Sequence, residues 1–272
     1  MRPKKVGIVS RCEAGDVQMV KEIMDEIGDA VKIVLDPRTA TKVGKRESTP
    51  IANMDVDVLI TVGGDGTILR ALQLLSKPTP ILGIDMGKIG FLADVSAKSA
   101  KDIIKKVLDG FEVEQRTRLA VSVNEEELPP ATNEAVIVTS RPAKMLHFRV
   151  LVDEKELETT RADGLVLATP TGSTAYAMSA GGPIVDRKID AFVVVPLAPF
   201  KLSARPWVVP ADSEIRVELL KAGKEALLVV DGQYTQKITK KDVIRFTKAK
   251  TPALFVKTDR GFYAKVRDKL VV

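Results

Sequence analysis

The segment of this sequence best suited to chemistry is a glycine-rich run with one carboxylate. Val58–Val62 leads directly into Gly63-Gly64-Asp65-Gly66-Thr67, and a helical pattern follows. Strand, glycine turn and helix form the context in which α/β sheets bind phosphates. A carboxylate among phosphate-binding amides is useful if Asp65 orients or deprotonates a hydroxyl, or faces a magnesium-bound triphosphate. The alternative is an ordinary strand-to-helix turn, and the position after a buried strand favours function.

A second segment, Arg161 to Pro183, is dense in glycines and hydroxyl side chains. It contains Thr169-Pro-Thr-Gly-Ser-Thr-Ala-Tyr176. Hydroxyls and exposed amides can bind phosphate or ribose, a tyrosine can flank a ring, and long loops in compact domains are usually functional. Serine-hydrolase chemistry is not expected, because His147 is the only histidine and no Gly-x-Ser-x-Gly elbow is present.

Three shorter motifs are ambiguous when each is taken alone. Gly87-Lys-Ile-Gly90-Phe-Leu92 could be a turn beside the same site. Asn133-Glu134 suits hydrogen bonding to a ribose or base, and an ordinary polar strand start fits it equally well. Val229-Val-Asp231-Gly232-Gln233 reads first as a strand ending in a hairpin turn.

Alternating strands and helices must position the glycine loop. Apolar runs and amphipathic stretches alternate through the first hundred residues, which predicts a parallel, doubly wound sheet. The predicted strands are Val6–Ser10, Val31–Leu35, Val56–Val62 and Pro80–Asp85, and the predicted helices are Asp16–Ile27, Thr67–Leu75 and Ser96–Asp109. We expect a Ser99-x-x-Asp102 capping box in the last of these, and a mobile loop over Asp36–Pro50.

From about Arg116 the pattern changes to short runs bounded by turn residues, with no long amphipathic helix between them. This predicts a β-rich second domain over residues 116–249 after an α/β domain over residues 1–115. The final stretch returns to helical spacing at Phe262–Leu270. We expect the segment 250–272 to be a helix that packs back on the first domain.

Composition narrows the class of protein further. The 272 residues are 45% hydrophobic and 4% aromatic, with one cysteine, Cys12, and a net charge of +6. A single cysteine fits a reducing cytoplasm, and no apolar run reaches the roughly 20 residues that span a bilayer. The excess of basic over acidic residues suits anionic partners such as nucleotides or polyphosphate. Few aromatics and interleaved charges argue against a nucleic-acid binder.

Taken together and in this order, the motifs resemble the NAD kinase family, of archaeal or bacterial type. The resemblance covers about Val58 to Gln233. Gly-Gly-Asp-Gly-Thr alone is shared with lipid kinases, whereas Thr-Gly-Ser-Thr-Ala-Tyr with Asn-Glu upstream is more specific. The resemblance implies an α/β fold followed by β structure: an N-terminal Rossmann-like nucleotide-binding domain and a C-terminal β-sandwich-like domain.

The resemblance also implies roles for particular residues. Asp65 would be the proton acceptor for the ribose hydroxyl, with Gly63, Gly64 and Thr67 in the phosphate loop. Substrate contacts would come from Gly66, Arg70, Asn133, Glu134, Lys144, Arg161, Asp163, Thr174, Ala175, Tyr176, Ala177, Met178, Ser179, Ala198 and Gln233. A neighbouring subunit is expected to help form the dinucleotide site, in a homodimer or homotetramer.

The implied reaction is phosphoryl transfer from ATP or polyphosphate to the 2′-hydroxyl of the adenosine ribose of NAD, giving NADP, with a divalent metal, magnesium, as cofactor. The metal ligands are not assigned. We expect a cytoplasmic enzyme with no nucleic-acid or membrane partner. A lipid or sugar kinase with the same glycine loop is the main alternative among enzymes, and a nucleotide sensor without turnover is the alternative from another class. Asp65 argues against the sensor, because near phosphates it would weaken binding unless it serves chemistry.

Overall fold

The structure is a computed structural model that describes residues 1–87, 90–221, 223, 225–258 and 261–270. Residues 88–89 of the predicted Gly87–Leu92 turn, and residues 259–260 and 271–272 of the predicted C-terminal segment, lie outside the described residues. The chain divides into two compact units, Met1–Arg116 with Ala253–Val272, and Thr117–Pro252. No helix in the described residues is long and apolar enough to cross a membrane.

The first unit is built on a seven-stranded sheet in the order β2-β1-β3-β4-β19-β6, with β5 paired to β4. Strands β1 to β5 and β19 pair in parallel, and β6 is antiparallel to β19. The central strand β3 is buried along its whole length, as its apolar sequence requires. The strand bounds are β1 Lys5–Ser10, β2 Lys32–Leu35, β3 Val58–Gly63, β4 Ile81–Asp85, β5 Val95–Ser96, β6 Val113–Arg116 and β19 Ala253–Val256.

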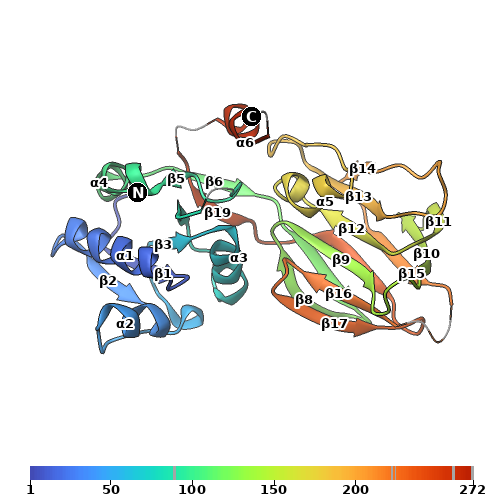
Figure 1. The fold of residues 1–272 in the computed structure, drawn as a ribbon, viewed down its shortest axis with the longest axis horizontal. Coiled ribbons are helices and arrows are strands. Elements are labelled where there is room, and N and C mark those ends of the chain that lie inside the picture. Colours follow the sequence, from blue (N-terminus) through green and yellow to red (C-terminus); the bar gives the residue numbers. More distant parts are fainter. Residues whose placement is uncertain (88–89, 222, 224, 259–260, 271–272) are drawn as a thin grey trace. The chain divides into compact units, whose positions relative to one another are not determined.

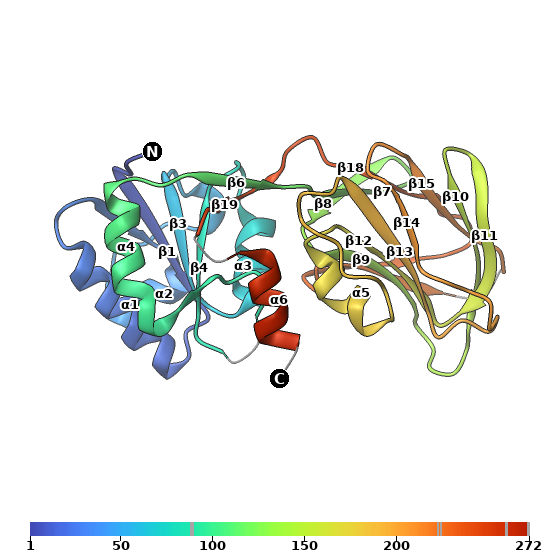
Figure 2. The ribbon, with the colours of Figure 1, turned by 90° about the horizontal axis from the view of Figure 1, so that it is seen from above.

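Helices cover both faces of this sheet (Figures 1 and 2). Side chains of α1, α2 and α4 join one apolar cluster, and those of α3 join a second cluster on the other face. The bounds are α1 Ala14–Ile27, α2 Pro37–Val43, α3 Asp65–Leu74, α4 Ala100–Asp109 and α6 Phe262–Leu270, with short 3-10 turns at Ile51–Asn53 and Ala97–Ser99. The return of the chain to this unit therefore supplies a strand, β19, in addition to the predicted helix.

Two local predictions are wrong. The expected loop Asp36–Pro50 contains helix α2, because the Asp36 carboxylate accepts hydrogen bonds from the N–H groups of Arg38 and Thr39, and Pro37 suits the first helical position. The expected capping box at Ser99 does not form. Ser99 has helical backbone angles, and the hydroxyl of Ser96 instead accepts the Ser99 N–H and caps a 3-10 turn before α4.

The second unit is a sandwich of two six-stranded antiparallel sheets, in the orders β11-β10-β15-β18-β7-β8 and β14-β13-β12-β9-β16-β17. One core cluster joins the two sheets, with Phe148 and Phe246 from the first and Phe192 and Leu228 from the second. The bounds are β7 Leu119–Val123, β8 Glu126–Ala131, β9 Glu134–Thr139, β10 Leu146–Val152, β11 Lys155–Ala162, β12 Gly164–Ala168, β13 Ala191–Leu197, β14 Trp207–Pro210, β15 Ile215–Leu219, β16 Ala226–Val230, β17 Tyr234–Ile238 and β18 Ile244–Lys248. An α/β unit followed by a β sandwich confirms the predicted fold class.

The second sheet is covered on its outer face as well. A 3-10 turn, Gly172–Thr174, and the short helix α5, Tyr176–Ser179, follow β12. Ala177 of α5 packs with Val166 and Val193 of the sheet in a separate apolar cluster. The hydroxyl-rich segment singled out in the sequence is thus fixed to the sheet by its own apolar residues.

Candidate active site

The glycine loop of the first unit lies where β3 ends and α3 begins. Gly63 has φ +153°, and an added Cβ would lie 2.4 Å from the Thr67 hydroxyl, so this position requires glycine. The N–H of Thr67 donates to the Gly64 carbonyl at 2.9 Å, which closes the turn. The first-turn N–H groups of α3 therefore face the loop, the arrangement that suits an anion.

Asp65 is held by three successive backbone amides. Its Oδ2 accepts from the Phe91 N–H at 2.6 Å, and its Oδ1 accepts from Leu92 at 3.0 Å and Ala93 at 3.1 Å. An added Cβ on Gly90 would lie 2.7 Å from Oδ1, so the second glycine of the Gly-x-x-Gly motif makes room for this carboxylate. A carboxylate has about four acceptor positions, so a substrate hydroxyl can still approach Asp65.

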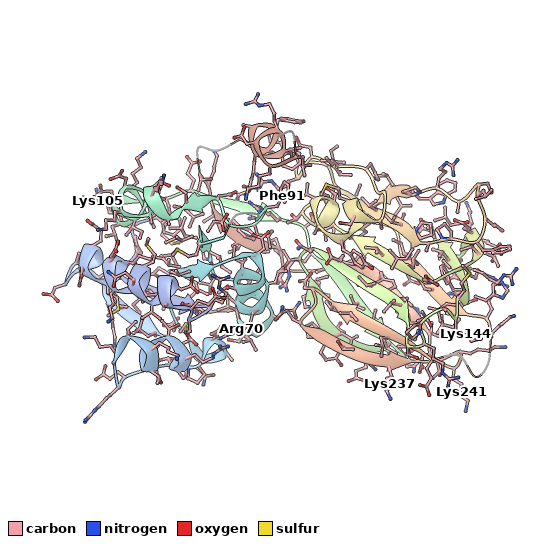
Figure 3. The ribbon with its side chains drawn as sticks, in the orientation of Figure 1. Arg70, Phe91, Lys105, Lys144, Lys237 and Lys241 are labelled. Atoms are coloured by element: carbon pink, nitrogen blue, oxygen red, sulfur yellow. The ribbon has the colours of Figure 1, made fainter. Side chains whose placement is uncertain are left out.

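Other strands bring further charges to the same edge of the sheet. Asp36 follows β2, and the predicted substrate-binding residue Arg70, on α3 (Figure 3), lies with its Nη2 3.5 Å from Oδ2 of Asp36. Asp85 is the register partner of Gly63, and its Oδ1 accepts the Gly87 N–H at 2.8 Å. Neither aspartate was singled out in the sequence, although a carboxylate at the end of an apolar strand is a usable signal.

In the second unit, Asp231 holds the Asn133-Glu134 motif. Its Oδ2 accepts from the Thr132 N–H at 2.7 Å, and its Oδ1 accepts from Asn133 at 2.8 Å and Glu134 at 3.1 Å. The Asp231 side chain is 3% exposed. The Asp-Gly pair of this turn therefore fixes the start of β9, and Gln233, exposed in the same turn, lies beside it.

Asn133 and Glu134 carry polar atoms that are buried and unbonded. Asn133 Oδ1 and Glu134 Oε2 have no hydrogen-bond partner among the described residues. Burial, and next to it the charge of Asp231, raises the pKa of Glu134 to about 8, opposed by a hydrogen bond from the backbone N–H of Tyr176. Buried polar atoms are usually paired, so these two atoms fit a ligand that would supply the missing partners.

The hydroxyl-rich segment lies against the same motif. The Thr169 N–H donates to the Asn133 carbonyl at 2.9 Å, and the Thr169 hydroxyl donates to Thr132 O at 2.6 Å. An added Cβ on Gly172 would lie 2.0 Å from the Asn133 carbonyl oxygen. The Ser173 hydroxyl is 2.7 Å from Pro170 O and is fully buried. Several hydroxyls of this segment thus hold its shape.

The residues predicted to contact the dinucleotide differ in exposure. Tyr176 is 46% exposed, so its ring is accessible beside Glu134. Ala177 is fully buried, and only its backbone could face a ligand. Thr174 is buried with its hydroxyl bonded to Thr171 O. Ala175 and Met178 are half-buried and Ser179 is exposed.

The remaining predicted contacts lie at the other end of the same sheet. Gly164 pairs with Val138, and Ala168 pairs with Glu134. Asp163 lies five residues from Ala168, so it is about 17 Å along the strands from the Asn133-Glu134 end. Ala198 follows β13 next to Asp163, whose N–H donates to Leu197 O.

Two basic residues complete this second group. Arg161 lies over the ring of Phe200 at 4.6 Å, and Lys144 is exposed in the turn after β9 (Figure 3). The structure therefore separates the predicted contacts of the second unit into two groups within one chain.

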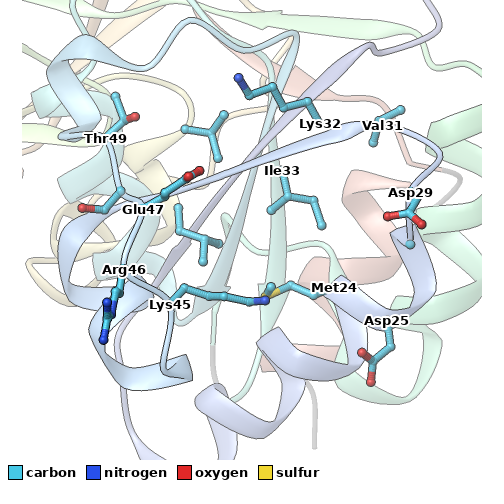
Figure 4. A pocket seen from close by; sticks show the side chains of 14 residues that line it. Met24, Asp25, Asp29, Val31, Lys32, Ile33, Lys45, Arg46, Glu47 and Thr49 are labelled. Atoms are coloured by element: carbon cyan, nitrogen blue, oxygen red, sulfur yellow. The ribbon is translucent and has the colours of Figure 1, made fainter.

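A hollow of about 1420 Å³ lies elsewhere, along the edge strand β2 (Figure 4). Its walls include the basic Lys32, Lys45 and Arg46 and the acidic Asp29 and Glu47. None of the predicted site residues lines it. It is therefore separate from the glycine loop between β3 and α3.

The chain thus combines a Rossmann-like unit that carries a carboxylate in its glycine loop with a β-sandwich unit. Models of the ATP-NAD kinase N-terminal and C-terminal domains match residues 14–111 and 132–258. The NAD kinase of Methanosarcina mazei is 48% identical to this chain, covering 98% of it and 94% of the relative. That of Methanothermobacter thermautotrophicus is 46% identical, covering 98% and 96%. The chain belongs to the NAD kinase family and is a phosphotransferase.

Solved structures agree with this assignment. The crystal structure of an NAD kinase from Archaeoglobus fulgidus in complex with ATP has a TM-score of 0.82 and 33% identity, and the match covers 97% of this chain and 98% of that one. Yeast NADH kinase complexed with NADH has a TM-score of 0.88 at 24% identity, covering 100% and 88%, and supports the fold.

Proposed function

We propose that this enzyme transfers the terminal phosphoryl group of ATP, or of polyphosphate, to the 2′-hydroxyl of the adenosine ribose of NAD. The bond from the 2′-oxygen to phosphorus forms while the bond from that phosphorus to its bridging oxygen breaks. The hydroxyl proton passes to Asp65, and ADP or a shortened polyphosphate leaves. The products are NADP and the spent donor.

The observation that carries this proposal is the placement of Asp65. Its carboxylate lies at the first position of α3, directly after β3, where backbone amides can hold phosphates. Three amides fix its orientation, and a positioned base contributes about 10²–10⁴-fold to such a transfer. The solved relative from Archaeoglobus fulgidus contains ATP, which favours ATP as the donor.

A divalent metal fits this site if it arrives with the nucleotide. No group of three or more His, Cys, Asp and Glu side chains in the described part of the chain could hold an ion by itself. Magnesium usually binds through substrate phosphates, water and one or two carboxylates, and Asp65 and Asp85 are the carboxylates beside the loop. The ion would neutralise charge on the transferred phosphoryl group.

For NAD, we propose the Asn133-Glu134 end of the second unit as the principal binding surface. With a pKa of about 8, Glu134 is largely neutral at pH 7, so its carboxyl group can donate a hydrogen bond to a sugar oxygen as well as accept one. Asn133 Oδ1 can accept a hydroxyl or amide proton, and Tyr176 can flank a ring.

The second group, Lys144, Arg161, Asp163 and Ala198, supports an oligomeric enzyme. Because Asp163 of one chain lies about 17 Å along the strands from Glu134, a second copy can bring its own group to the first copy's dinucleotide. We propose a homodimer or homotetramer in the cytoplasm. Light scattering after size exclusion tests the assembly, and mixing Glu134→Ala with Asp163→Ala chains should restore part of the activity if the site is shared.

A direct assay tests the reaction. Purified protein is incubated with NAD, magnesium and either ATP or polyphosphate, and NADP is read out with an NADP-specific dehydrogenase. NADP formation with at least one donor is the expected result. Binding of NAD without NADP formation would favour the nucleotide sensor, and phosphorylation of a lipid or sugar acceptor alone would favour the other kinases. An arm with NADH in place of NAD determines which redox form is preferred.

A further inference from the structure

The C-terminal helix α6 carries two lysines that reach the segment around Asp65. Lys265 and Lys269 are four residues apart and so lie on one face of the helix. The Lys265 side chain is 1% exposed and the Lys269 side chain 12% exposed. Figure 2 shows α6, and these contacts fix it to the segment that follows β4.

Both ammonium groups bind backbone carbonyls of residues 90–94. Lys265 Nζ donates to Phe91 O at 2.6 Å and to Ala93 O at 3.2 Å, and it forms an ion pair with Asp94. Since an ammonium group has three protons to donate, Lys265 uses all three. Lys269 Nζ donates to the carbonyl of Gly90, and lies 3.5 Å from Asp85 Oδ2.

The same segment binds Asp65 through its backbone N–H groups. Its carbonyls accept from the two lysines, and the N–H groups of Phe91, Leu92 and Ala93 donate to Asp65. Residues 90–94 thus form a short bridge between α6 and the carboxylate. A shift of this bridge changes the position of Asp65 directly, because both oxygens of Asp65 are bound to it.

We propose that Lys265 and Lys269 are positioning residues for phosphoryl transfer, which hold the 90–94 segment by its carbonyls so that its amides orient Asp65. This inference rests on the proposed role of Asp65. Both lysines bind this segment through its backbone carbonyls. They act through the backbone of the bridge, from more than 170 residues along the chain.

The energetics favour orientation over stability as the role of these charges. Lys265 lies beside Arg116, which is 1% exposed and has its Nη2 3.5 Å from Asp94 Oδ2. Burial lowers the pKa of Lys265, and Asp94 opposes that shift. Apolar side chains of similar volume often give equal or greater stability than buried ion pairs. A buried ammonium group, however, fixes three acceptors in defined directions, which an apolar side chain cannot do.

Lys269→Met is the principal test, because Lys269 is less buried and its loss leaves the Lys265 pairs in place. Arg267→Met on the same helix is the matched control. Arg267 is 72% exposed and its guanidinium lies 3.8 Å from Asp268 of its own helix. We expect kcat of Lys269→Met to fall by about 10- to 100-fold through misplacement of Asp65, with KM for NAD and ATP and the unfolding midpoint close to those of Arg267→Met.

A double-mutant cycle separates positioning from a structural role. In an Asp65→Asn background, Lys269→Met should reduce kcat by less than about two-fold, because the carboxylate that it orients is already lost. If Lys269→Met reduces kcat by the same factor in the wild-type and Asp65→Asn backgrounds, the inference is wrong. Equal kcat for Lys269→Met and Arg267→Met in an enzyme that makes NADP would overturn the inference and leave the proposed function intact.

Hydrogen–deuterium exchange provides a readout that does not depend on turnover. Peptides covering residues 90–94 should exchange faster in Lys269→Met and Lys265→Met than in wild type or Arg267→Met. Unchanged exchange would show that the lysines do not hold the bridge. A wild-type protein that makes no NADP while the exchange differences are present would refute the proposed function, with the lysine contacts themselves upheld.

Discussion

Replacing Asp65 by asparagine tests the chemistry most directly. Asparagine keeps the size and shape of the side chain and removes the charge that accepts the ribose proton. A ribose hydroxyl is a poor nucleophile at neutral pH, and we therefore expect kcat to fall by at least about 100-fold. Binding of NAD should be largely kept, since the Asn133-Glu134 motif lies in the other unit.

The structure adds a second, measurable effect. Oδ1 of Asp65 accepts two N–H groups and Oδ2 accepts one, from Phe91. An asparagine can place its single oxygen toward Leu92 and Ala93, but its NH₂ group then faces the Phe91 N–H. One partly buried donor loses its acceptor, which costs about 1–3 kcal/mol. Asp65→Asn should therefore lower the free energy of unfolding by about that amount.

The assay measures kcat and both KM values by coupled NADP detection, NAD affinity by calorimetry and stability by denaturant unfolding. Asp231→Asn is the matched control, because Asp231 accepts three successive amides in the same way. A similar loss of stability is expected, with the kinetic effect mainly on KM for NAD. Near-normal turnover of Asp65→Asn would refute the base role, and a defect that shrinks at high magnesium would assign Asp65 to the metal instead.

Three further changes test the surrounding structure. Tyr176→Ala should raise KM for NAD more than KM for ATP, and unchanged values for both would make the Thr174–Ser179 stretch a structural loop. Gly90→Ala should lower kcat while the fold, checked by circular dichroism, persists, because the new Cβ would lie 2.7 Å from Asp65 Oδ1. Glu134 keeps its proton in the folded protein up to about pH 8, against an ordinary pKa of 4.5. Its contribution to stability is therefore full below about pH 4.5 and is lost as the pH rises to about 8, so wild type should lose about 1.4 kcal/mol per pH unit relative to Glu134→Gln in denaturant unfolding across that window. Parallel pH profiles for the two proteins would contradict the raised pKa.

Local signals explain which parts of the fold were predictable. The apolar run of β3 and the glycine turn after it identify a buried parallel strand that leads into a helix. The change to short runs near Arg116 reflects a real change from helices to a β sandwich. These features depend on residues close together in the sequence, so they can be predicted from the sequence alone.

The contacts that the sequence did not predict join residues that are far apart in the chain. The amides that hold Asp65 come from 26 to 28 residues further along the chain. The lysines of α6 contact this segment from more than 170 residues away. Strand β8 contains Pro129-Pro130, a pair that taken alone favours a loop. It is the edge strand of its sheet, where a proline is tolerated because no second neighbour needs its N–H.

The two units share one hydrogen-bond arrangement around an aspartate. Asp65 and Asp231 are each the aspartate of an Asp-Gly pair, and each accepts three successive backbone amides through both oxygens. Asp65 is partly exposed at the start of α3, so its own carboxylate is available to a substrate. Asp231 is 3% exposed, and among the described residues buried polar atoms without a hydrogen-bond partner lie on the residues that it holds, including Asn133 and Glu134. In the proposed mechanism, the same hydrogen-bond pattern therefore orients a reactive carboxylate in one unit and a binding motif in the other, and exposure decides which of the two roles the aspartate can have.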